Sequence, residues 1–172
     1  MSASTATPLQ TGTWQVQAAD SRAGFTVANL GKTVAGTVPV RSGEVEVDAS
    51  GAPRRLVAEL DLAALDTGNA RREKDLRKPR FLDLDAHPTL TFVSDRISTQ
   101  HDGWTAQGTI AARGTSCPLT LHGTLPGEPG PDGRVPVEAT AVLDRRDLGL
   151  KAPRLMIGRQ VGITVTAWLR LA

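Results

Sequence analysis

Residues 67–92, TGNARREKDLRKPRFLDLDAHPTLTF, form the one long interruption in a chain that otherwise alternates apolar and polar residues. Gly68 and Asn69 tolerate positive φ and predict a turn, and Asn69 can also cap a short helix over residues 70–78. Pro79 ends that helix, because the residue before a proline avoids the helical region. The stretch therefore predicts a short helical lid inserted between two strands.

On both sides of this stretch, apolar residues recur at every second position, which is typical of strands with one buried face. The pattern is clear at residues 44–48, where Val45 and Val47 alternate with acidic residues, and at residues 161–171. About eight such segments and a single helix predict an all-β fold, an antiparallel up-and-down barrel. Closure into a barrel removes the exposed sheet edges that invite aggregation.

Two segments are predicted to be irregular. Gly36 and Pro39 interrupt the alternation within residues 31–39, which indicates a connection rather than a strand. Residues 1–11 are small and polar and predict a flexible tail ahead of a single domain over residues 12–172.

Composition and charge argue against several classes of protein. A net charge of +2 gives no support for nucleic-acid binding. The first residues lack the basic and apolar regions of a signal peptide, and no stretch is long enough to span a membrane. We therefore expect a cytoplasmic protein without stable membrane insertion. Cys117 is the only cysteine, so no internal disulfide can form, and a buried thiol is expected.

No constellation of residues indicates catalysis, so we expect a protein that is not an enzyme, binds no metal and needs no cofactor. His87, His101 and His122 are far apart and lack the spacing of a metal-binding helix. Asp83 and Asp85 lie two positions apart, but no motif links them to a base or a metal.

Small residues on the faces predicted to point inward indicate a hollow barrel. These inward positions hold Ala58, Ala106, Gly108, Ala112, Gly123, Ala139 and Ala141. A barrel of about eight strands leaves room for side chains or for one slender ligand. An unfilled apolar space costs about 24 cal/mol per Å³, so a ligand explains it well. The alternative is that small residues relieve crowding where the strands coil.

Basic residues concentrate in two places. Residues 71–80 hold Arg71, Arg72, Lys74, Arg77, Lys78 and Arg80 against Glu73 and Asp75, and a second group holds Arg145, Arg146, Lys151 and Arg154. Either these residues form a solvated face, in which Arg72 and Arg145 pair with carboxylates such as Asp144 or Asp147, or some of them bind a head group at the barrel mouth. Arginine forks suit phosphate oxygens, which favours an anionic head group in the second case.

Several motifs follow one another in an order that identifies a family. They are Trp14, Phe25-Thr26-Val27, Thr67-Gly68-Asn69-Ala70, Arg72-Glu73, Leu76-Arg77, Phe81-Leu82-Asp83, His87-Pro88-Thr89-Leu90-Thr91-Phe92, Gly108, Arg113-Gly114 and Asp144-Arg145-Arg146-Asp147-Leu148-Gly149. Together they closely resemble the YceI-like family, whose members have a lipocalin-like barrel and bind polyisoprenoids. The resemblance covers nearly the whole chain from Gly12. Asp75 and Leu148 depart from the family pattern, in which a His and an aromatic residue are common, so head-group selectivity can differ.

The resemblance implies that the chain binds a long-chain apolar lipid, a polyisoprenoid such as a quinone or a prenyl pyrophosphate, for transport or storage. It also implies a homodimer formed through an exposed strand face. The residues expected to line the tunnel are Phe25, Val27, Leu60, Phe81, Phe92, Trp104, Ile110, Leu121, Val165 and Leu169. The residues expected to contact a head group are Asn29, Asn69, Arg72 and Arg145.

Three alternatives stay open. A fatty acid or fatty amide could occupy the same tunnel. The chain could be a lipid-modifying enzyme that uses the basic lid as an electrophilic clamp. A filled barrel could instead serve as an interaction module without any ligand.

Overall fold

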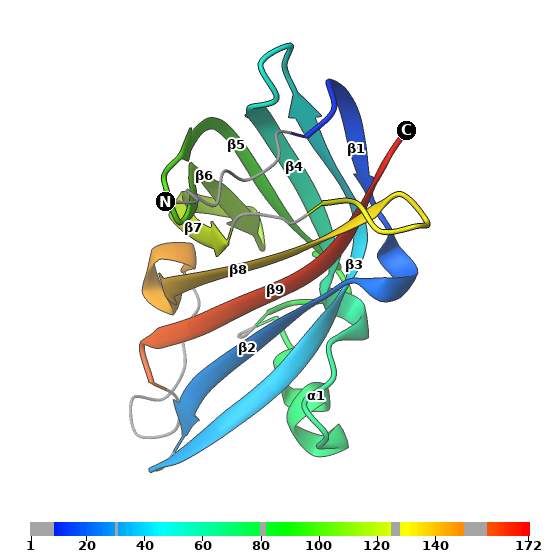
Figure 1. Ribbon diagram of the computed structural model, residues 1–172. Helices are drawn as coiled ribbons and strands as arrows, with labels where there is room; N and C mark the ends of the chain where they lie inside the picture. The colour runs from blue at the N-terminus through cyan, green and yellow to red at the C-terminus, as the bar shows by residue number, and fades with distance from the viewer. Residues whose placement is uncertain (1–8, 30, 80–81, 125–127, 150–157) are drawn as a thin grey trace.

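Nine β-strands form one antiparallel sheet that curls into a barrel in the described part of the chain (Figure 1). The computed structural model describes residues 9–29, 31–79, 82–124, 128–149 and 158–172. The strands are β1 (Gly12–Val16), β2 (Arg22–Asn29), β3 (Lys32–Val47), β4 (Pro53–Asp61), β5 (Thr89–Thr99), β6 (Gly103–Ala112), β7 (Thr115–Thr124), β8 (Arg134–Asp144) and β9 (Gln160–Leu171). The helices are α1 (Ala70–Leu76) and the 3-10 turns η1 (Ala18–Asp20), η2 (Leu62–Ala64) and η3 (Arg145–Leu148).

The strands follow an up-and-down order. Each strand from β2 to β9 pairs with the next along the chain, and β9 pairs back with β2 to close the ring. β1 pairs with both β3 and β9 beyond Arg22, the first residue of β2. β1 and β2 therefore occupy the same position in the barrel wall, one after the other, with η1 between them. The predicted all-β up-and-down barrel with one short helix is confirmed.

The prediction of an irregular connection at residues 31–39 was wrong. β3 begins at Lys32, and its first eight residues pair with β2, from Lys32 opposite Asn29 to Pro39 opposite Arg22. Gly36 does not break the strand but makes room for an aromatic ring, because a Cβ atom there would lie 2.4 Å from Cζ of Phe25. A glycine inside a strand often marks such a close approach.

The lid, defined as residues 62–88, connects β4 to β5 at the end of the barrel opposite the C-terminus (Figure 1). As predicted, the Asn69 side chain caps α1 and accepts a hydrogen bond from the Arg72 amide at 3.0 Å. The Glu73 carboxylate accepts a hydrogen bond from the backbone N–H of Asn69 at 3.2 Å, so contacts in both directions hold the first turn of α1. Leu84 is 2% exposed and anchors the lid in the main core.

The opposite end of the barrel, which we call the closed end, is filled by side chains. A separate buried cluster, which we call the plug, consists of Trp14, Val45, Val47, Val135 and Leu169. Trp14 is 2% exposed, and its indole Nε1 donates a hydrogen bond to the Gln10 carbonyl at 2.9 Å. Trp14 therefore closes the base of the barrel.

Candidate functional site

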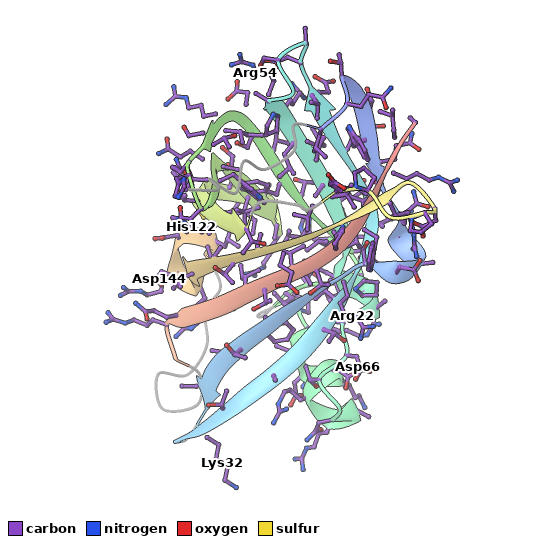
Figure 2. The ribbon with its side chains drawn as sticks, in the orientation of Figure 1. Arg22, Lys32, Arg54, Asp66, His122 and Asp144 are labelled. Atoms are coloured by element: carbon purple, nitrogen blue, oxygen red, sulfur yellow. The ribbon has the colours of Figure 1, made fainter. Side chains whose placement is uncertain are left out.

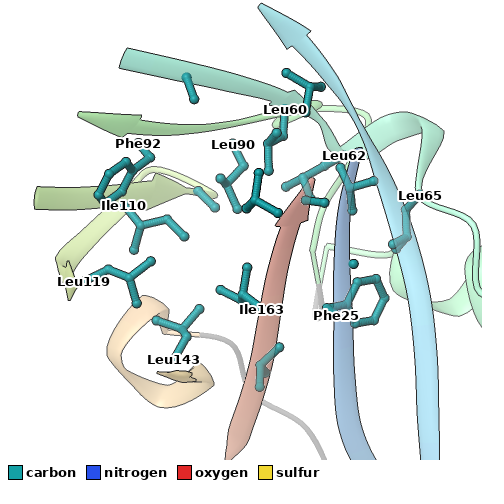
Figure 3. Close-up of a pocket in the computed structure, with 18 of the residues that line it drawn as sticks. Phe25, Leu60, Leu62, Leu65, Leu90, Phe92, Ile110, Leu119, Leu143 and Ile163 are labelled. Carbon is teal, nitrogen blue, oxygen red and sulfur yellow. The ribbon is translucent and has the colours of Figure 1, made fainter. Parts of the chain in front are cut away.

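An apolar cavity of about 530 Å³ lies inside the barrel between the lid and the plug. Side chains from opposite walls point into it, among them Phe25 from β2, Leu60 from β4 and Ile163 from β9 (Figure 3). The lid contributes Leu62 and Leu65 to the same surface (Figure 3). The cavity is therefore enclosed by strands on its sides and by the lid at one end.

Nine of the ten predicted tunnel residues line this cavity. They are Phe25, Val27, Leu60, Phe92, Trp104, Ile110, Leu121, Val165 and Leu169. The tenth, Phe81, lies outside the described residues. The prediction missed Val34 and Val38, because residues 31–39 were assigned to a connection, and it also missed Val40, which follows that segment. Their alternation along β3 was the signal that could have found them.

The small inward residues serve two purposes. Those that line the cavity are Ala58, Ala112 and Ala139. Gly108 and Gly123 instead make room for rings: a Cβ atom at Gly108 would lie 2.7 Å from Cζ of Phe92, and one at Gly123 would lie 2.0 Å from Cε2 of Trp104. Relief of crowding and hollowing of the interior therefore both occur in this barrel.

The polar part of the described cavity wall lies at the lid end. It consists of Thr67, Asn69, Arg71, Arg72 and Asp75 from the lid and Arg145 from η3. Three of the four predicted head-group residues, Asn69, Arg72 and Arg145, thus lie together at this end. The side chain of the fourth, Asn29, is outside the described residues. The cavity combines a long apolar wall with one polar end.

The two neighbouring arginines of η3 have different surroundings. Arg145 is 7% exposed, faces the cavity, and donates a hydrogen bond from Nε to the Gly158 carbonyl at 3.1 Å. Asp144, at the end of β8 (Figure 2), pairs with Arg146 at 2.8 Å. The hydrogen bond from the Arg146 side chain lowers the pKa of Asp144 to about 2. Arg146 therefore braces Asp144 at the end of β8.

Arg113 joins two segments at the lid end. It lies with Gly114 in the turn between β6 and β7, where both residues have positive φ, at 55° and 72°. Its guanidinium group donates from Nη1 to the Gly149 carbonyl at 3.2 Å and from Nη2 to the Pro79 carbonyl. One side chain therefore ties the lid to the residue that follows η3.

Replacing Arg113 with Asn should loosen the lid without unfolding the barrel. Asn tolerates positive φ, so the turn is retained while both guanidinium contacts are lost. We expect faster hydrogen exchange at the lid amides of Leu82 and Leu84 and unchanged exchange within β8 and β9. An Arg96→Asn variant, altered at an exposed position of β5, is the control. Equal lid protection in both variants and the natural protein would show that the contacts do not hold the lid.

The described residues contain no group of three or more His, Cys, Asp and Glu side chains that could hold a metal ion. His122 is exposed on the outside of β7 (Figure 2). Cys117 is buried, and burial raises the pKa of its thiol. A raised pKa lowers the fraction of reactive thiolate at neutral pH. None of the described helices has the length and apolar character needed to cross a bilayer.

Comparison with protein families gives a match to the YceI-like domain over residues 14–169. A UPF0312 protein of Pseudomonas aeruginosa (strain LESB58) is 32% identical over 91 residues, which cover 51% of this chain and 48% of that protein. The chain thus spans about half the length of this curated relative. A UPF0312 protein of Photorhabdus laumondii is 26% identical over 134 residues, covering 75% of this chain and 70% of that protein.

Solved structures show the same fold at low sequence identity. BcnA of Burkholderia cenocepacia superposes with a TM-score of 0.78 at 17% identity, over 89% of this chain and 98% of that chain. A domain of Saccharophagus degradans, described as a polyisoprenoid binding domain implicated in plant cell wall breakdown, gives a TM-score of 0.62 at 14% identity. That match covers 92% of this chain and 98% of that domain.

Proposed function

The chain belongs to the YceI-like family, and we propose that it binds a long-chain isoprenoid lipid inside the barrel, for transport or storage and without chemical change to the lipid. The observation that carries this proposal is the combination of a long apolar wall with a single polar end. Burial of each methylene contributes about 0.8 kcal/mol, so an apolar chain can bind tightly with few polar contacts. The polyisoprenoid-binding description of the Saccharophagus degradans domain supports this choice of lipid.

The proposed orientation places the head group at the lid end. Arg72 and Arg145 supply guanidinium groups there, and Asn69 supplies an amide. Two guanidinium forks suit the several oxygens of a phosphate or pyrophosphate, whereas a quinone carbonyl would use only one of them. A prenyl pyrophosphate is therefore the form of the ligand that best uses these groups. Asn29 and Phe81 remain proposed contacts.

Titration with a polyprenyl phosphate tests the proposal. Trp104 lines the cavity, whereas Trp14 lies in the plug. The third tryptophan, Trp168, lies with its ring centroid 4.8 Å from Cζ of Arg134. We expect a saturable change in tryptophan emission that is lost in a Trp104→Phe variant. A fatty acid and a fatty amide of similar length are the competitors. Preference for either competitor would favour that alternative, and an absence of saturable binding to any lipid would contradict the proposal.

Replacing Arg72 with Gln should weaken binding of a charged head group selectively. A charge-assisted hydrogen bond contributes about 1.5–3 kcal/mol, so we expect at least about a tenfold loss of affinity for a prenyl pyrophosphate. Affinity for the matching uncharged polyprenol should change by less than about threefold. An equal effect on both ligands, or unchanged affinity for the pyrophosphate, would remove Arg72 from the head-group site. Isothermal titration of both ligands gives the comparison.

The homodimer stays a prediction. Sedimentation of the protein with and without bound lipid would test it, because a lipid-dependent dimer and a constitutive dimer give different results.

A further inference from the structure

The floor of the cavity coincides with the top of the plug. Val45 and Leu169 belong to the plug and also line the cavity, whereas the plug residues Trp14, Val47 and Val135 do not line it. Val137 packs against the plug and lines the cavity as well. The boundary between the hollow and the filled part of the barrel therefore passes through these shared residues.

The floor is held in place by strand pairing and not only by side-chain packing. Val45 lies on β3 opposite Trp14 of β1, and Trp14 lies opposite Leu171 of β9. Val137 of β8 pairs with Ala167 of β9. Because backbone ladders fix these positions, the floor cannot move down to admit a longer chain without breaking the packed plug.

The polar residues at the opposite end lie on the lid and on η3, and Arg113 holds these two segments together through its bonds to the Pro79 and Gly149 carbonyls. A ligand with its head group at that end can extend its chain only as far as the floor. Each additional buried CH₂ multiplies affinity by about four, but carbon atoms beyond the floor would gain nothing or would force the head group out of its contacts.

We propose that Leu169, Val45 and Val137 form a ruler that sets the longest isoprenoid chain the barrel accepts. This inference rests on the proposed function and adds the residues that determine chain length. Two substitutions should move the ruler in opposite directions. Leu169→Ala lowers the floor, and Val137→Phe raises it beside the small residues Ala139 and Ala167.

The test measures affinity for a series of prenyl phosphates, from geranyl through farnesyl and geranylgeranyl to longer members. For the natural protein we expect affinity to rise with each isoprene unit and then to level off at one length. In Leu169→Ala the next longer member should gain about tenfold in affinity, consistent with about two more buried carbon atoms. In Val137→Phe the rise should stop at least one unit earlier.

Leu62→Ala is the matched control, because Leu62 lines the cavity from the lid. It removes the same atoms and enlarges the cavity without lowering its floor, so the length at which affinity levels off should stay unchanged. An unchanged length in both floor variants, or the same shift in Leu62→Ala, would overturn the ruler while leaving the proposed function standing. If the natural protein binds no isoprenoid of any length, the proposed function fails and the ruler fails with it.

Discussion

An Ala112→Phe variant is expected to lose at least about a hundredfold in affinity for an isoprenoid lipid while its barrel remains folded. Ala112 is 5% exposed, ends β6 and lines the cavity. A phenyl ring at this position would occupy space that the lipid chain needs. Displacing about four methylenes removes about 3 kcal/mol of binding free energy, since each contributes about 0.8 kcal/mol.

The free energy of unfolding of this variant should rise slightly or stay unchanged. Filling an apolar cavity restores dispersion contacts that an empty space lacks. We therefore expect the free energy of unfolding to change by less than about 1 kcal/mol. A lipid titration and urea unfolding of the same preparation separate the two effects.

The neighbouring alanine is the control. Ala111 is half-buried on the other face of β6, opposite Thr91 and Ser116. Ala111→Phe adds the same ring outside the cavity, so its affinity for lipid should match that of the natural protein. Full binding by Ala112→Phe, or an equal loss in both variants, would contradict a ligand inside the barrel.

A Trp14→Ala variant is expected to show the largest loss of stability. Large-to-small substitutions of a buried tryptophan cost about 3–5 kcal/mol. Trp14 also loses the hydrogen bond from Nε1 to Gln10. Since native domains have a total stability of about 5–15 kcal/mol, the variant should unfold at a much lower urea concentration.

Trp168→Ala is the matched comparison. Trp168 is half-buried, and its ring lies beneath the Arg134 guanidinium group. Loss of that contact should cost only about 1 kcal/mol beyond the burial of the ring. If Trp14→Ala were no more destabilising than Trp168→Ala, the plug would not be the filled core that we describe.

The sequence predicted the wall of the barrel better than its interior. Alternating residues are enough to assign strands and their inward faces, because the side-chain period of a strand is two. The same reasoning placed Asn69 at the start of α1, where the capping contact is local in sequence. It failed at Gly36, whose role depends on the Phe25 ring across the β2–β3 pair.

The features that could not be predicted depend on contacts between residues that lie far apart in the sequence. Nothing in the local pattern separates Leu60, on the cavity wall, from Val135, in the plug. That difference arises only when the closed barrel brings Val135 next to Trp14. The role of Arg113 is likewise invisible in sequence, because its acceptors lie 34 and 36 residues away along the chain.

The division of the interior into a hollow part and a filled part also bears on the alternatives. A fatty acid would use the same wall and a single arginine, so only the ligand itself distinguishes it from an isoprenoid. An enzyme would need turnover of that ligand. An interaction module would need the cavity to stay empty in the purified protein.

Mass spectrometry of lipid extracted from protein that was purified without detergent shows directly what the barrel carries. We expect an isoprenoid lipid in about equimolar amount with the natural protein and none with Ala112→Phe. Natural protein that is consistently free of lipid, or that carries only fatty acids or fatty amides, would contradict an isoprenoid ligand inside the barrel.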